Sequence, residues 1–156
     1  MNLRALLPLP LLLSATLTAC HAGPEASAET PPFPSPPGVE HAMPVRYLEI
    51  VTPDVPGVCA AYAASLDVTF GEPAAGLGQA RTAPLPGGGL LGVRAPMHES
   101  EQPVVRPYWL VTDIEAALAA AEQAGAEVIH PPLLIPGHGT FAITLHGGIQ
   151  HGYWQD

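Results

Sequence analysis

Two stretches decide the fold of this chain: Tyr47–Val55 reads YLEIVTPDV, and Arg106–Ile114 reads RPYWLVTDI. Each is an apolar run with β-branched residues, typical of a strand, that reaches an Asp able to cap a following helix. Superimposing Asp54 on Asp113, an offset of 59 residues, gives the same order of elements both times. The chain beyond residue 43 therefore reads as two copies of one structural unit.

Helices are expected after both stretches. The segments Val58–Leu66 and Glu115–Ala124 are rich in alanine, and Pro56 suits the first turn of the first helix. Gly125 is a good end for the second helix. Because alanine side chains are small, each helix is predicted to pack closely against a sheet.

Glycines recur in register after both helices. The matching sets, at offsets of 60 or 61 residues, are Gly76-Leu77-Gly78 with Gly137-His138-Gly139, Gly87-Gly88 with Gly147-Gly148, and Gly92 with Gly152. Glycines that repeat at a turn, a hairpin and a strand indicate a repeated backbone path. Each copy therefore reads as a strand, a helix and three further strands.

A repeated βαβββ unit resembles the vicinal oxygen chelate family, which includes glyoxalase I, bleomycin- and fosfomycin-resistance proteins, and extradiol dioxygenases. The resemblance covers residues 45 to 155 and rests on the two strand-to-helix steps, the glycine pattern and the closing Gly152-Tyr153-Trp154-Gln155. It implies an α+β fold in which two units, 44–101 and 102–156, form a cup-shaped mixed sheet with helices on its outer face. The same resemblance implies a homodimer.

The resemblance also implies positions for a divalent metal, and this chain lacks the ligands there. Family enzymes place His or Gln seven residues before the capping Asp of each unit, and Glu near the end of each unit's last strand. Those positions hold Tyr47, Arg106, Gly92 and Gly152. They offer neither the imidazole nor the carboxylate that Zn²⁺, Mn²⁺ or Fe²⁺ requires, and Arg repels a cation. No cofactor is predicted.

Three histidines offer an alternative metal site. His146 and His151 flank the last predicted hairpin turn, and His138 lies in the matching glycine loop. Imidazoles gathered near one end of the molecule could bind Zn²⁺ or Cu²⁺. The competing interpretation is that they are ordinary turn and strand residues, and that interpretation is favoured.

Strand alternation identifies the side chains that share a face with the four former ligand positions. The predicted cup lining combines aromatic, charged and hydrogen-bonding groups: Tyr47, Glu49, Leu90, Arg94, Arg106, Tyr108, Gln150 and Trp154. This mix suits a small planar or anionic organic molecule. The alternative is an ion pair of Arg94 or Arg106 with Glu49 that leaves a filled, inert cup.

Three functions compete for such a domain. The first is a metal-free, glyoxalase-like binding protein for a small organic ligand. The second is an enzyme with a non-standard metal, or with Tyr47 and Glu49 as acid–base groups. The third is a non-catalytic dimerisation module. The missing metal ligands favour the first and third functions over catalysis.

The beginning of the chain resembles a bacterial lipoprotein signal. Residues 1–19 contain Arg4, an apolar run too short for a confident membrane span, and Leu17-Thr18-Ala19 directly before Cys20. The resemblance implies cleavage before Cys20 and its lipidation; the alternative is an ordinary secretory signal in which Cys20 is incidental. His21 is not the Asp that retains enteric lipoproteins in the inner membrane, which favours the periplasmic side of the outer membrane.

Composition limits the partners. Residues 20–43 are rich in Pro and Ala and read as a tether. The formal net charge is −9, and the 5 basic residues are all Arg. This balance argues against a nucleic-acid partner and against electrostatic attraction to anionic lipid. Contact with a membrane is therefore expected only through the lipid on Cys20.

Overall fold

The computed structural model describes residues 43–85 and 88–156. These residues belong to one compact unit, Val39–Asp156. The predicted signal peptide, Cys20 and the tether up to residue 42 lie outside the described residues, as does Gly87 of the first glycine hairpin. In the described part of the chain, no helix is both long and apolar enough to cross a membrane.

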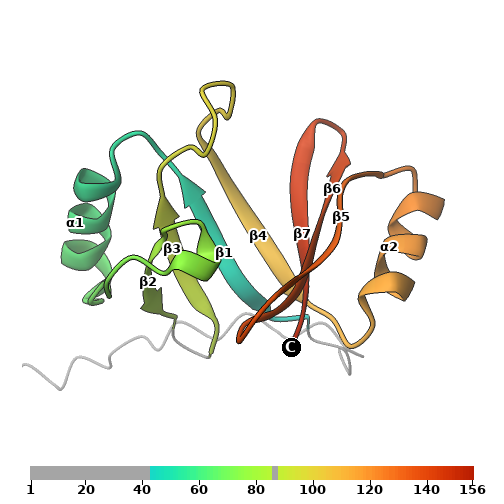
Figure 1. Ribbon diagram of the computed structural model, residues 1–156, viewed down its shortest axis with the longest axis horizontal. Helices are drawn as coiled ribbons and strands as arrows, with labels where there is room; N and C mark the ends of the chain where they lie inside the picture. Colours follow the sequence, from blue (N-terminus) through green and yellow to red (C-terminus); the bar gives the residue numbers. More distant parts are fainter. Residues whose placement is uncertain (1–42, 86–87) are drawn as a thin grey trace, which may run out of the picture. The chain divides into compact units, whose positions relative to one another are not determined.

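A seven-stranded mixed sheet carries the fold, with the strand order β2-β3-β1-β4-β7-β6-β5. Figure 1 shows α1 beside the first half of this sheet and α2 beside the second half. The elements, in chain order, are β1 (Val45–Val51), α1 (Val55–Leu66), a 3₁₀ turn η1 (Ala75–Leu77), β2 (Arg81–Pro84), β3 (Leu90–Arg94), β4 (Val104–Leu110), α2 (Ile114–Gln123), β5 (Glu127–Ile135), β6 (Gly139–His146) and β7 (Ile149–Gln155).

Both helices begin where an aspartate caps them. The Asp54 carboxylate accepts a hydrogen bond from the Gly57 backbone N–H at 3.0 Å, and Asp113 accepts one from the Ala116 N–H at 3.0 Å. Each bond satisfies a backbone donor that has no partner within the first turn of the helix. The predicted caps and both helices are thus confirmed, and Gly125 follows α2 with a positive φ of 90°.

The two central strands confirm the repeat. β1 and β4 pair antiparallel, with Leu48 opposite Pro107, Tyr47 opposite Tyr108, and Glu49 opposite Arg106. Leu48 and Pro107 are themselves 59 residues apart, so the offset read from the sequence is also the offset of the paired strands. A local two-fold axis that relates the two strands therefore passes between these two residues.

The helices and an aromatic cluster lie on opposite faces of the sheet. Under α1, Cys59 packs with Ile50, Leu91 and Val93. Under α2, Ile114 and Leu118 pack with Ala142. The alternate positions of the same strands face the other way and form a second cluster around Tyr47, Tyr108 and Trp154. The predicted α+β cup with helices on its outer face is confirmed.

The first unit differs from the expected pattern in one element. Between α1 and β2 it has only η1 and an isolated bridge between Ala74 and Ala80, where the second unit has the long strand β5. This segment contains Pro73 and several glycines, and Gly78 and Gln79 both have positive φ. Such residues weaken or end a strand. The sheet consequently has seven strands.

Candidate functional site

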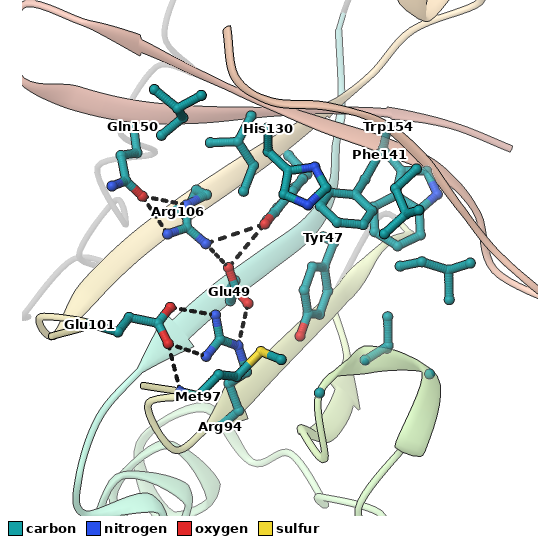
Figure 2. A pocket seen from close by; sticks show the side chains of 18 of the residues that line it. Tyr47, Glu49, Arg94, Met97, Glu101, Arg106, His130, Phe141, Gln150 and Trp154 are labelled. Carbon is teal, nitrogen blue, oxygen red and sulfur yellow. Dashed lines mark hydrogen bonds and ion pairs between the residues drawn. The ribbon is translucent and has the colours of Figure 1, made fainter. Parts of the chain in front are cut away.

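A cavity of about 710 Å³ lies on the inner face of the sheet. Seven of the eight predicted cup residues line it: Tyr47, Glu49, Arg94, Arg106, Tyr108, Gln150 and Trp154. Figure 2 shows Glu49, Arg94, Arg106 and Gln150 pointing toward one another. Leu90 does not line it and packs against the aromatic cluster instead. Strand alternation predicts which face of the sheet a side chain lies on, but not whether the cavity extends to that point of the strand. Leu90 is the first residue of β3 and lies outside the cavity, whereas Arg94 is the last residue of β3 and lines it. That the seven bind a ligand stays a prediction.

Glu49 is the centre of a buried polar cluster. Its side chain is 7 % exposed and accepts a hydrogen bond from Arg94 Nε at 2.6 Å. Its second oxygen accepts from Arg106 Nη1 and from the Tyr108 hydroxyl, the latter at 3.0 Å. β1 and β4 place these groups together because Glu49 is paired with Arg106 across the two strands.

A second carboxylate completes the charge balance. Glu101, in the loop before β4, accepts from Arg94 Nη1 at 2.8 Å and from Nη2 at 2.7 Å. It also accepts from the Met97 backbone N–H at 2.7 Å. The hydrogen bonds from Arg94 lower the pKa of Glu101 to about 2. Burial lowers the pKa of Arg94, but its bonds to Glu101 and Glu49 outweigh burial and raise it.

Arg106 joins the cluster to the start of β7. Its Nε donates to Gln150 Oε1 at 3.0 Å, and its Nη2 donates to the same oxygen. The amide oxygen therefore faces the guanidinium, and the amide NH₂ group of Gln150 has no hydrogen-bond partner among the described residues. We call Glu49, Arg94, Glu101, Arg106, Tyr108 and Gln150 the polar cluster.

The polar cluster is electrically neutral, because it contains two arginines and two carboxylates. The predicted pairing of an arginine with Glu49 is present twice over. The cup is nevertheless not filled, because the cavity remains beside the cluster. Both guanidinium charges are already paired, so the site holds no excess positive charge for an anion.

Tyr47 has the one buried side-chain oxygen or nitrogen in the described chain without a hydrogen-bond partner. The side chain lines the cavity, and its hydroxyl lies over Gly92 of β3, where a Cβ atom would collide with it. Burial raises the pKa of Tyr47, and the charge of Glu49 adds to the effect. The group therefore stays a neutral phenol, and it makes no hydrogen bond to Glu49. The predicted acid–base use of Tyr47 and Glu49 finds no support in this geometry.

Aromatic rings line another part of the cavity. Trp154 lies 5.8 Å from Tyr47 and 6.4 Å from Phe141, measured between ring centroids, and the His130 ring lies 4.8 Å from Phe141. The indole N–H of Trp154 donates to the His138 carbonyl at 3.0 Å, which fixes the indole. We call Tyr47, His130, Phe141 and Trp154 the aromatic wall. Fixed rings of this kind suit a flat apolar ligand.

The positions that would hold the family's metal do not fit one. Tyr47 and Arg106 lie in the aromatic wall and the polar cluster, and the tyrosine rings pack over the two glycines: Tyr47 over Gly92 and Tyr108 over Gly152. A carboxylate at either glycine would need the space of a ring. In the described ranges, no group of three or more His, Cys, Asp or Glu side chains could hold a metal ion.

The alternative that His138, His146 and His151 gather near one end of the molecule is wrong. His138 precedes β6, and His146 is its last residue. A strand rises about 3.3 Å per residue, so the two histidines lie at opposite ends of an extended segment. The glycine turns at 137–139 and 147–148 lie at opposite ends of β6.

Sequence reasoning missed several cavity residues. Phe141 and Ile143 pair with Trp154 and Gly152 of β7 and lie on the same face, so alternation extended to β6 would have found them. Glu101 had no such signal, because it lies in a loop. The remaining missed lining residues come from η1, the loop before β4, and β5: Ala75, Gly76, Leu77, Gly78, Met97, His98, Ile129, His130, Leu133 and Ile135.

No protein-family model matches the chain, and no curated protein matches its sequence. Solved structures do match the fold. The hypothetical protein BH1468 from Bacillus halodurans C-125 is 14% identical with a TM-score of 0.58, and 74% of this chain and 96% of that chain are covered. Methylmalonyl-CoA epimerase from Mycobacterium tuberculosis is 16% identical with a TM-score of 0.53, covering 70% and 85%.

A Streptomyces coelicolor methylmalonyl-CoA epimerase variant, solved in complex with 2-nitronate-propionyl-CoA, is 13% identical with a TM-score of 0.53, and 74% of this chain and 99% of that chain are covered. These neighbours have vicinal oxygen chelate folds. At such low identities the likeness shows the fold alone. The domain described here therefore has the vicinal oxygen chelate fold.

Proposed function

We propose that this domain is a metal-free binding protein for a small, planar organic molecule. The observation that carries the proposal is the cavity of about 710 Å³ that the polar cluster and the aromatic wall line together. Cavities of roughly 300–1,000 Å³ that combine apolar walls with a few placed polar groups are typical of small-molecule sites. Of the planar or anionic ligands that the sequence predicts, the anionic class is set aside, because the arginines are already paired with carboxylates.

Two further observations support binding over catalysis. Both Glu49 oxygens accept hydrogen bonds from the polar cluster, so neither is left as a free base. Tyr47 and Tyr108 both have pKa values raised by burial and stay neutral. A third observation supports ligand binding itself: a neighbour of the same fold was solved with 2-nitronate-propionyl-CoA, so this architecture can hold an organic ligand.

The proposal is tested by titrating the purified full-length chain with a panel of planar aromatic compounds in an isothermal calorimeter. We expect saturable binding of one compound per cavity. The variant Ile143→Trp, which places an indole in the cavity, should weaken that binding at least tenfold, while the exposed change Gln123→Glu leaves it unchanged. Binding that survives Ile143→Trp, or no binding at all, would contradict the proposal. Stoichiometric Zn, Mn, Fe or Ni in protein purified without chelator would contradict the metal-free part.

We propose in addition that the domain is carried on the periplasmic side of the outer membrane by lipidated Cys20. The signal-like residues 1–19 and the Pro- and Ala-rich residues 20–43 support this placement. A homodimer is the proposed assembly, supported by the resemblance to the family. Light scattering of the purified chain tests it, and a single species with the mass of one chain would contradict it.

A further inference from the structure

We infer that the ligand of this cavity is uncharged and presents a hydrogen-bond acceptor, such as a carbonyl oxygen, to the polar cluster. This inference rests on the proposed function and names the chemical class of the ligand. It follows from which hydrogen-bonding groups the cluster has already used and from the sum of its charges.

The acceptors of the polar cluster are used by its own donors. Glu49 accepts three hydrogen bonds and Glu101 accepts three. Gln150 Oε1 accepts two, both from Arg106. Each carboxylate oxygen and the amide oxygen therefore already faces at least one N–H or O–H group. A ligand donor would have to compete with a charged arginine for any of them.

The unused capacity of the cluster consists of donors. A guanidinium carries five N–H groups, and Arg94 and Arg106 each use four of them in hydrogen bonds within the described residues. The amide NH₂ of Gln150 is unused there as well. All three residues line the cavity. A ligand that supplies acceptors would satisfy these groups, whereas a hydrocarbon would leave them without partners.

The charges of the cluster disfavour an anion. Two arginines face two carboxylates, and the whole chain has a formal net charge of −9. An anionic ligand would lose its hydration on entering the cavity and would meet guanidinium groups whose charge is already compensated. An uncharged carbonyl group loses less hydration and can accept the same hydrogen bonds. The aromatic wall then takes the flat body of the ligand.

The test uses three probes of matched size: 2-acetylnaphthalene, 2-ethylnaphthalene and 2-naphthoate. They share one ring system and differ in carrying an uncharged acceptor, no acceptor or an anion. Calorimetry on the full-length chain at neutral pH should give a dissociation constant for the acetyl probe about tenfold below that of the ethyl probe, the usual scale of one added hydrogen bond, about 1.4 kcal/mol. Naphthoate should bind more weakly than the acetyl probe.

The variant Gln150→Glu identifies the donor. Its carboxylate keeps acceptors for Arg106 and removes the amide NH₂, so the ratio of the ethyl to the acetyl dissociation constant should fall toward one. Gln123→Glu adds the same charge at the end of α2, outside the cavity, and should keep the ratio. An unchanged ratio in Gln150→Glu would show that an arginine N–H group, and not the Gln150 amide, donates to the ligand. The inference is overturned if naphthoate binds tightest or if the acetyl and ethyl probes bind wild-type protein equally. Each of these results would leave the proposed binding function standing, whereas failure of all three probes and of the aromatic panel would refute that function.

Discussion

Two tyrosines that face each other across the central strands hold their hydroxyl groups in opposite environments. Tyr47 and Tyr108 are paired between β1 and β4, and both are 4% exposed. The Tyr108 hydroxyl donates to Glu49 at 3.0 Å, whereas the Tyr47 hydroxyl has no partner in the described chain. A buried hydroxyl without a partner costs about 1–3 kcal/mol of folding free energy. The two residues thus form a matched pair for mutation.

Removing each hydroxyl should therefore change stability in opposite directions. Tyr47→Phe is expected to keep or raise the free energy of unfolding, by up to about 1–3 kcal/mol, because it deletes an unsatisfied polar atom. Tyr108→Phe should lower it by about 1–2 kcal/mol, because Glu49 loses a hydrogen bond. Urea denaturation of both variants measures the difference. Equal losses in the two variants would show that Tyr47 has a partner in solution.

Glu101 should make the free energy of unfolding depend on pH in the acidic range. Its pKa is lowered from 4.5 to about 2 by Arg94, so the folded state holds it ionised more firmly than the unfolded chain does. The resulting stability is fully present above pH 4.5 and is lost as pH falls toward 2. Glu101→Gln should thus be less stable than wild type at pH 7, and the gap should close across this range. Thermal melts at several pH values test this, with the exposed change Glu72→Gln as the control; a constant gap would contradict it.

At the scale of elements, β3 and β7 each carry a glycine under a tyrosine of a neighbouring strand. An ideal Cβ at Gly92 would overlap the side chain of Tyr47, and one at Gly152 would overlap the ring of Tyr108. The requirement is for space and not for a special backbone angle, because neither glycine has a positive φ. Both strands therefore need glycine at these positions so that the tyrosine rings can pack against the backbone.

Adding one methyl group tests this packing. Gly92→Ala should lower the free energy of unfolding by about 1–3 kcal/mol, the usual cost of overpacking a well-filled core. Gly71→Ala is the control, because its Cβ would approach only the Thr82 carbonyl oxygen, at 3.7 Å, an ordinary contact. Chemical denaturation of both variants gives the comparison. A change at Gly92 no larger than that at Gly71 would show that the Tyr47 ring can move aside freely.

The elements were predictable where the chain repeats itself. Asp54 and Asp113 located both helices, because a capping side chain acts on the backbone next to it. Alternation placed Tyr47 and Glu49 on the correct face, because successive side chains of a strand point to opposite faces of the sheet. The Glu101 contact with Arg94 was not predictable, because a loop has no such period and its path depends on the partner that it meets.

For the whole molecule, the sequence predicted which residues line the cup, but it did not predict that their charges cancel. Arg94 and Arg106 were correctly placed on the cavity side, and their presence suggested an anionic ligand. The structure pairs both with carboxylates, one of which, Glu101, comes from an unpredicted loop. A pairing in three dimensions can thus neutralise residues that, read one by one, predict an electropositive site. The same caution does not apply to the net charge of the chain, which is a sum over residues.

That net charge sharpens the prediction for membrane attachment. With 14 acidic residues against 5 arginines, the chain gains no electrostatic attraction to an anionic membrane surface, so attachment should depend on acyl chains alone. Cys20→Ser is therefore expected to move the protein from the membrane fraction to the soluble fraction of a bacterial host, at both low and high salt. Cys59→Ser is the control, because Cys59 is buried on the sheet-facing side of α1 and should not affect attachment. Immunoblots of the fractions, with mass spectrometry of the amino-terminal peptide, measure the outcome. A Cys20→Ser protein that stays with the membrane would contradict the lipid anchor.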